Sequence, residues 1–434
     1  MIRSRSSSTG TGAPEFTEAD LPGLRGRGFA LLIMATAVGL CGFAAVLPLV
    51  PLWASRGGAG EFGAGGTTAA FMLTTVLTQL GMPWLLDHAG GYRWTFPVGS
   101  LVMGLPMPLF ALTTELGPLV AVSAVRGVGF GMVTVAGTAL AARLVAKEQV
   151  GRATGYYGLA VGLPQIVILP GGVALALNIG FGTAFWLTGI CGVLAAVLAS
   201  GIWFADGGRN RAALRGADAG AGQQGGDGRP ESPRGLRLLA ALAAPLVIML
   251  VVSSAASAVV TFLAIPLEQA AWLVSALLAA YALTLVTGRW TAGVVYDRYR
   301  RTLLLLPGMA AAVVGAGLLT AGLWANGDGA PGAGVALLVL AGTALFGLGF
   351  GAVQNETVTV MLGRAGPAGY GRASAVWNIG YDAGTGAGAI GLGLVIQLMG
   401  YGPAFAAVAV TLTAVLPLAL RRRRAQGRTG LSTS

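Results

Sequence analysis

The sequence predicts an all-α integral membrane protein of twelve transmembrane helices, arranged as two parallel-repeat bundles of six helices. Of its 434 residues, 55% are hydrophobic and only 10% are charged. Apolar runs follow one another along the chain, each close to the roughly 20 residues that a helix needs to cross a hydrocarbon core about 30 Å thick. One polar stretch, residues 205–236, divides these runs six and six.

The apolar runs are continuous, whereas the strands of a membrane barrel alternate in polarity over segments of about ten residues. Helices are therefore the predicted element. The 71 glycines are interpreted as packing surfaces, because small residues let helices approach closely in lipid. The predicted spans are residues 29–52, 66–86, 93–112, 118–141, 153–177, 181–204, 238–264, 272–296, 302–325, 333–360, 372–398 and 402–420.

Basic residues favour one side of the predicted membrane. All of the 27 lysines and arginines lie in the tails and in alternate loops, except Arg56, Arg126 and Arg289. The positive-inside rule then predicts that both termini are cytoplasmic in a multi-pass protein of the inner (plasma) membrane. A net charge of +11 distributed in this way fits attraction to anionic lipid, so nucleic acid is not expected as a partner.

These assignments define five parts of the chain. We expect a cytoplasmic N-terminal tail (1–28), an N-terminal six-helix bundle (29–204), a flexible cytoplasmic linker (205–236), a C-terminal six-helix bundle (237–420) and a cytoplasmic C-terminal tail (421–434).

An internal repeat relates the two bundles. Gly127-Val-Gly-Phe-Gly131 matches Gly347-Leu-Gly-Phe-Gly351, and Gly151-Arg-Ala-Thr154 matches Gly371-Arg-Ala-Ser374, with the same spacing along the chain in both cases. Asp87 and Asp297 form a third pair, at a slightly shorter spacing. Two parallel halves are the simplest explanation of the shared spacing.

The loop sequence Gly293-Val-Val-Tyr-Asp297-Arg298-Tyr-Arg-Arg301 resembles the loop signature of the major facilitator superfamily, Gly-x-x-x-Asp-Arg-x-Gly-Arg-Arg. The first half has a degraded copy, Pro83-Trp-Leu-Leu-Asp87-His88-Ala-Gly90-Gly-Tyr-Arg93. The resemblance extends from residue 29 to residue 420 and implies that family's fold and transport activity. Arg126-Gly-Val-Gly-Phe-Gly131 is similar to the helix-four motif that the family associates with proton coupling in its drug and metabolite exporters.

The negative charges of the two loop-signature aspartates, Asp87 and Asp297, each need a partner that stabilises them. Each lies at the C-terminal end of a predicted helix, where the helix dipole destabilises a negative charge by roughly 0.3 to 1 kcal/mol. The resemblance implies a latch in which Asp87 pairs with Arg93 and with the start of the predicted span at residues 372–398. The alternative is that Asp87 is a solvated loop charge. The predicted cytoplasmic gate comprises Asp87, Arg93, Asp297, Arg298, Arg301 and Arg289.

Two charges lie deep inside predicted spans. Arg126 is about 12 Å inside helix four at 1.5 Å per residue, where a charge costs roughly 2.5 to 3.5 kcal/mol, so it should face a cavity or an acid. The alternative is an arginine that extends to the outer surface. Asp382 lies near the midplane and can exchange a proton as a cavity opens to either side. The alternative is that Asp382 makes a structural hydrogen bond across the interface formed by its own helix, the predicted span at residues 372–398.

The remaining candidates surround these charges or lie in helix five. The predicted coupling and substrate cavity contains Asp382, Arg126, Asn378, Tyr381, Glu356, Gln354 and Asn355. Helix five has a degraded form of the exporters' glycine- and proline-rich motif, and prolines in a membrane helix permit bending. The predicted hinge is Gly158, Gly162, Pro164 and Pro170.

We therefore expect a proton-driven exporter of a small amphipathic molecule, which works by alternating access as a monomer. It should need no cofactor or metal, and the proton gradient should supply its energy. An uptake symporter for a sugar, an organic acid or an amino-acid-like metabolite is the alternative, with Arg126 binding an anionic group. A membrane-embedded enzyme is disfavoured, because the spans contain no histidine and no His-Glu-x-x-His or phosphate-loop pattern. A receptor is disfavoured, because it would carry a folded soluble domain for signalling, and the longest polar segment between spans is the linker at residues 205–236.

Overall fold

The computed structural model describes residues 23–87, 91–146, 149–205, 236–326, 331–365 and 370–430. Most of the predicted tails and linker lie outside these residues. The described secondary structure is helical and contains no strand. The first half comprises α1 (Arg27–Arg56), α2 (Gly60–Asp87), α3 (Gly91–Gly104), α4 (Leu116–Arg143), α5 (Val150–Asn178) and α6 (Phe181–Gly201). The second half comprises α8 (Leu236–Ser257), α9 (Ala271–Tyr299), α10 (Leu305–Ala325), α11 (Ala333–Ala365), α12 (Tyr370–Met399) and α13 (Tyr401–Gly430).

Each predicted span overlaps one of these helices, so the predicted fold class is confirmed. Two spans are less regular than predicted. The third combines α3 with a short 3-10 helix, η3 (Met107–Leu112), and the seventh passes from α8 into a π-helix, η6 (Ala258–Phe262). Helix α13 continues to Gly430, beyond the predicted end of the last span at residue 420.

Helix α2 contacts both halves. Eleven helices of the described residues are long and apolar enough to cross a membrane; the twelfth predicted span is α2, where the side chain of Pro83 lies outside the described residues. It packs against α4 of its own half and α12 of the other half. The Thr74 hydroxyl donates to the Ala124 carbonyl oxygen (2.7 Å), and the Thr75 hydroxyl donates to that of Gly127 (3.0 Å). Helix α2 is therefore packed between its own half and the other half.

The repeated glycine motif places the helices of each half at close range. On α4, the first and third glycines of the motif face α2, and the middle glycine faces α3. On α11, the first and third glycines face α9, and the middle glycine faces α10. A methyl group at any of these positions would collide with a neighbouring backbone or side chain; they are Gly127, Gly129, Gly131, Gly347, Gly349 and Gly351. The duplicated motif therefore has a packing role in both halves.

Exposed tryptophans mark two levels along the helices. Three lie toward the end of the bundle where α1 begins and α13 finishes, here called the terminal end: Trp84, Trp94 and Trp290. Three others lie toward the opposite end, here called the far end: Trp186, Trp272 and Trp324. Each is more than half exposed. Amphipathic rings at two levels are typical of a protein with an apolar membrane between them.

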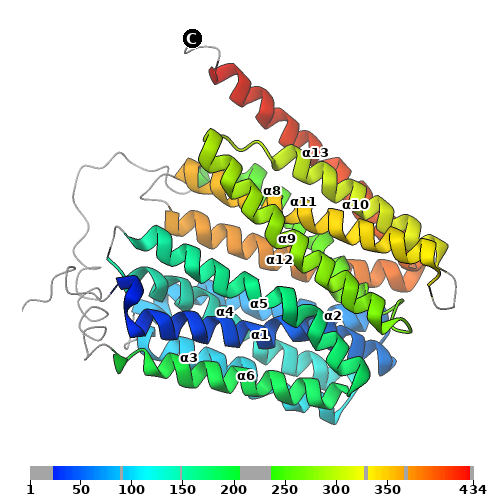
Figure 1. Ribbon diagram of the computed structural model, residues 1–434, viewed down its shortest axis with the longest axis horizontal. Helices are drawn as coiled ribbons and strands as arrows, with labels where there is room; N and C mark the ends of the chain where they lie inside the picture. The colour runs from blue at the N-terminus through cyan, green and yellow to red at the C-terminus, as the bar shows by residue number, and fades with distance from the viewer. Residues whose placement is uncertain are drawn as a thin grey trace, which may run out of the picture.

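The two halves lie side by side, with their helices running in broadly similar directions (Figure 1). Helix α2 packs along α12, α5 packs along α9, and η6 contacts α1 and α2. Residues on α2 and α12 therefore lie where the halves meet, and the site occupies this region and its flanks.

Candidate functional site

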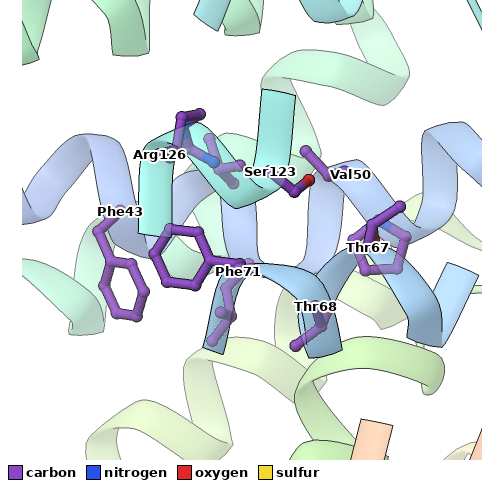
Figure 2. Close-up of a pocket in the computed structure, with 10 residues that line it drawn as sticks. Phe43, Val50, Thr67, Thr68, Phe71, Ser123 and Arg126 are labelled. Atoms are coloured by element: carbon purple, nitrogen blue, oxygen red, sulfur yellow. The ribbon is translucent and has the colours of Figure 1, made fainter. Parts of the chain in front are cut away.

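A pocket between α1, α2 and α4 contains the buried arginine of the first half. Figure 2 shows Arg126 and Ser123 of α4, Phe71, Thr67 and Thr68 of α2, and Phe43 and Val50 of α1 around it. Val46, Leu47 and Pro51 complete the lining. The wall is mostly apolar, and none of these ten residues is an acid.

Arg126 is only 3% exposed. Its Nε donates to the Met103 carbonyl oxygen (3.0 Å), and its guanidinium carbon lies 5.4 Å from the Phe71 ring centroid and 5.6 Å from that of Phe110. Both separations fall in the range of cation–π attraction. Among the described residues Arg126 has no ion pair. Arg126 was predicted to face either a cavity or an acid, and in this structure it lines a pocket.

Asp382 connects the two halves. Its side chain is 4% exposed on α12, and its Oδ2 accepts a hydrogen bond from Gln79 Nε2 of α2 at 2.7 Å. The Gln79 Oε1 atom is buried without a hydrogen-bond partner in the described residues. The bond that was the structural alternative for Asp382 is therefore present, and it joins opposite halves.

A row of aromatic rings lies beside Asp382 in the second half. Tyr281 of α9 stacks near Phe350 of α11, with 6.4 Å between ring centroids. Phe350 stacks near Tyr381 (6.2 Å), and Tyr381 stacks near Trp377 (5.9 Å), both on α12. The predicted cavity residue Tyr381 thus belongs to an aromatic surface that runs across three helices.

Arg289, a residue of the predicted gate, lies on α9 about two helical turns after Tyr281 of this row. Its carbonyl oxygen accepts a hydrogen bond from Asn355 Nδ2 (2.9 Å), and Asn355 Oδ1 accepts one from Thr359 (3.1 Å). Arg289 and Asn355 therefore form part of the contact between α9 and α11.

Glu356 stabilises the start of a helix. It is 1% exposed, and its Oε1 accepts a hydrogen bond from the backbone N–H of Leu304 (3.3 Å), the residue that precedes α10. A carboxylate at a helix N-terminus satisfies free N–H groups and interacts favourably with the helix dipole. This contact gives Glu356 a packing role, and its Oε2 has no described hydrogen-bond partner.

Two other predicted cavity residues, Asn378 and Gln354, make no described hydrogen bond to the other half. Asn378 Nδ2 donates to the Ser374 carbonyl oxygen one turn earlier on α12 (2.9 Å). Gln354 is buried, and its Oε1 has no hydrogen-bond partner among the described residues. Neither contacts Asp382 through a described bond.

In the first half, the described contacts of the predicted latch are those of Arg93 alone. The Arg93 guanidinium lies over the rings of Trp94 (4.5 Å) and Trp203 (5.1 Å). Asp87 is the last residue of α2, and its side chain lies outside the described part of the structure. The pairing of Asp87 with Arg93 stays a prediction.

In the second half, Asp297, Arg298 and Arg301 are exposed, and none forms a described ion pair. Arg300, which occupies the glycine position of the family signature, ends α9 with a left-handed backbone (φ 53°). That conformation costs a non-glycine residue about 1 to 2 kcal/mol. Here the departure from the signature has a local energetic cost.

The predicted hinge lies within one unbroken helix. Helix α5 runs from Val150 to Asn178 through Pro164 and Pro170. A methyl group added at Gly158 or Gly162 would meet no atom within 4 Å, so these glycines do not serve close packing in this structure. Bending at this point stays a prediction.

Side-chain bonds join the halves at the far end. Arg56 Nε pairs with Glu268 Oε2 (3.1 Å), and Gln397 Oε1 accepts a hydrogen bond from the Phe62 backbone N–H (3.2 Å). The Tyr401 hydroxyl donates to Glu61 Oε1 (3.2 Å). Each of these contacts must break before the halves can separate at the far end, so together they favour the described conformation.

Replacing Arg56 with glutamine should open the far end more often, but only modestly. The pair is 41% and 36% exposed, and exposed ion pairs contribute about 0 to 1 kcal/mol. Opening should therefore rise by no more than about fivefold. The measurement is labelling of a Thr68→Cys pocket cysteine by an impermeant maleimide from the far side, with Cys41 and Cys191 replaced by serine.

The charge-swapped pair Arg56→Glu with Glu268→Arg should restore slow labelling, and Glu115→Gln, which removes an exposed acid at the same end, should not change it. Equal labelling of the native chain and Arg56→Gln would show that the ion pair does not hold the far end closed.

Several residues of the site were not predicted. Gln79, Phe43, Phe71, Phe130 and Tyr281 were all absent from the candidate residues, although an amide inside a span is costly enough to be noticed. Phe43 and Phe130 stack with 4.2 Å between ring centroids. Apolar aromatic residues in an apolar helix give no sequence signal that separates a cavity wall from a lipid-facing surface.

Comparison with known proteins agrees with this architecture. The family model described as Major Facilitator Superfamily matches residues 31–270, and no curated protein matches.

Solved structures with the same fold include the nucleoside transporter NupG, which has a TM-score of 0.66 at 11% identity and covers 90% of this chain and 98% of its own. A peptide transporter of the POT type in complex with alafosfalin has a TM-score of 0.72 at 14% identity, covering 93% and 97%. A POT family transporter in complex with 5-aminolevulinic acid has a TM-score of 0.71 at 12% identity, covering 93% and 98%. At these identities the likeness shows the fold.

Proposed function

Because the chain belongs to the Major Facilitator Superfamily, and is thus a membrane transporter, we propose that it exports an amphipathic small molecule in exchange for protons. The two halves alternate between exposing the site at the terminal end and at the far end. The basic tails and loops favour placing the terminal end in the cytoplasm and the protein in the plasma membrane. The transporter acts as a monomer, without a cofactor.

The observation that carries proton coupling is the bond between Asp382 and Gln79. A hydrogen bond to a charged group contributes about 1.5 to 3 kcal/mol, and a neutral one about 0.5 to 1.5 kcal/mol. Gain or loss of a proton on Asp382 therefore changes the strength of a contact that spans the two halves. Protonation is in this way linked to the equilibrium between the two conformations.

The composition of the pocket supports an amphipathic substrate. Its lining offers three hydroxyl groups, from Thr67, Thr68 and Ser123, and the Thr67 hydroxyl already donates to the Ala64 carbonyl oxygen (2.7 Å). A sugar requires many hydrogen-bonding groups to replace its water shell. The aromatic and aliphatic wall favours a molecule with a large apolar surface.

The direction of transport is tested in everted membrane vesicles that contain the protein. An acid-inside pH gradient should drive accumulation of at least one member of a panel of amphipathic fluorescent compounds with positive, negative or no charge. The accumulation should collapse when an ionophore removes the gradient. Gradient-dependent accumulation in right-side-out vesicles alone would instead establish uptake, and vesicles without the protein are the control.

A further inference from the structure

The buried guanidinium of Arg126 has more hydrogen-bonding capacity than the protein uses. An arginine side chain has five N–H donors, and among the described residues only the Nε–H is engaged, with the Met103 carbonyl oxygen. The terminal nitrogens have no described hydrogen bond. Since buried charges are normally paired, this side chain, which lines the pocket, is suited to a negative group that arrives with a ligand.

The aromatic rings around Arg126 leave its charge available. Phe71 and Phe110 lie 5.4 and 5.6 Å from the guanidinium carbon, and such ring contacts stabilise the cation without accepting its hydrogen bonds. A guanidinium held in this way can present two parallel N–H groups to a carboxylate, sulfonate or phosphate. The Ser123 hydroxyl also lines the pocket and can donate to the same group.

The position equivalent to Arg126 in the second half has no charge. By the spacings of the internal repeat, the ring pair Phe71 and Phe130, with centroids 5.3 Å apart, corresponds to Tyr281 and Phe350, 6.4 Å apart. The spacing that relates the two glycine motifs places Phe346 at the position of Arg126, and Phe346 is fully buried. The position of Arg126 is thus a cation beside aromatic rings in the first half and a phenylalanine in the second half.

We propose that the transported molecule is an organic monoanion with an aromatic body, whose anionic group binds Arg126 and whose body packs against the rings of Phe43 and Phe71. This assignment rests on the proposed transport function and narrows its substrate class. The apolar rest of the pocket, Val46, Leu47 and Val50, excludes a second charge. A dianion would leave one of its two charges buried without a partner, and a cation would leave both its own charge and that of Arg126 unpaired.

The charge of the substrate also determines how the membrane potential acts on transport. Exchange of an outgoing anion for an incoming proton moves net positive charge inward, so a negative interior assists it. Uptake of the same anion with a proton would be electroneutral. An anionic substrate therefore fits export better than it fits accumulation.

The test is equilibrium binding of 2-naphthoate and of its neutral analogue 2-naphthamide to the purified full chain in lipid nanodiscs, without a gradient. The naphthoate should bind about tenfold or more tightly than the amide, because a charged hydrogen bond is lost with the carboxylate. Arg126→Gln should remove this preference and leave amide binding unchanged. Arg126→Lys, which keeps the charge without the planar fork, should retain part of it.

Arg25→Gln removes an exposed arginine and serves as the matched control, with both affinities unchanged. Equal affinity for the two probes, equal weakening of both by Arg126→Gln, or no binding of either probe to the native protein would overturn the assignment. Gel filtration of each variant separates loss of binding from loss of fold. Because no gradient is present, a failure of proton-driven export does not affect this result, and a failure here leaves proton-driven export standing.

Discussion

Replacing Asp382 with asparagine is expected to abolish gradient-driven transport while substrate exchange without a gradient continues. The amide has nearly the shape of the carboxyl group and can still hydrogen-bond to Gln79, but it cannot gain or lose the proton. Proton movement is thereby separated from the equilibrium between the two conformations. Flux of the best-transported panel compound into acid-inside vesicles should fall to the level of protein-free vesicles, and counterflow should persist.

The same change at Glu356 provides a matched comparison. Glu356 is also a buried carboxyl in the second half, but its Oε1 accepts the Leu304 backbone N–H at the start of α10. A glutamine oxygen can accept that bond, so Glu356→Gln should keep gradient-driven flux. The opposite outcome, coupling lost in Glu356→Gln and kept in Asp382→Asn, would assign the coupling proton to Glu356.

Replacing Gly351 with alanine is expected to be the most destabilising single methyl addition in α11. Its Cβ atom would overlap the Leu285 carbonyl oxygen of α9 and lie 2.9 Å from the Arg289 backbone nitrogen. Neither is the tip of a flexible side chain, so α9 and α11 must move apart. Overpacking of this kind costs about 1 to 3 kcal/mol or more. The measurements are the yield of monodisperse protein in detergent and its thermal unfolding midpoint.

Gly363→Ala is the control on the same helix, because a methyl group there would meet no atom within 4 Å. It should match the native midpoint or exceed it slightly, since alanine favours a helix by up to about 1 kcal/mol over glycine. If both variants unfold at the same temperature, the glycine repeat has no packing role. Gly127→Ala, which would overlap the Phe71 carbonyl oxygen, extends the test to the first half.

The fold could be predicted from the sequence because each helix must provide its own apolar surface to a membrane. Hydrophobic runs located every helix, and the shared spacing of the repeat located the equivalent glycines. The prediction was least precise where helices end or become irregular. The break between α3 and η3 and the change from α8 to η6 depend on local backbone geometry that hydrophobicity does not encode.

The site could be predicted only in part. Burial of Arg126 and Asp382 followed from their positions along helices of known rise. Their surroundings did not follow, because Gln79 lies 303 residues from Asp382 in the chain. The orientation of a side chain around its helix decides whether it caps another helix, as Glu356 does, or faces a cavity. Sequence position fixes depth but not orientation.

The position of α2 between the two halves also has a consequence for how the chain is made. A ribosome completes α2 at Asp87 and must synthesise eight further α-helices of the described chain before it reaches Tyr370, the first residue of α12. At roughly 5 to 20 residues per second, that interval is on the order of tens of seconds. During this time α4 can accept hydrogen bonds from Thr74 and Thr75, but Gln79 has no Asp382 to bind. The contact between Gln79 and Asp382, which links the two halves in the finished protein, is thus among the last to form.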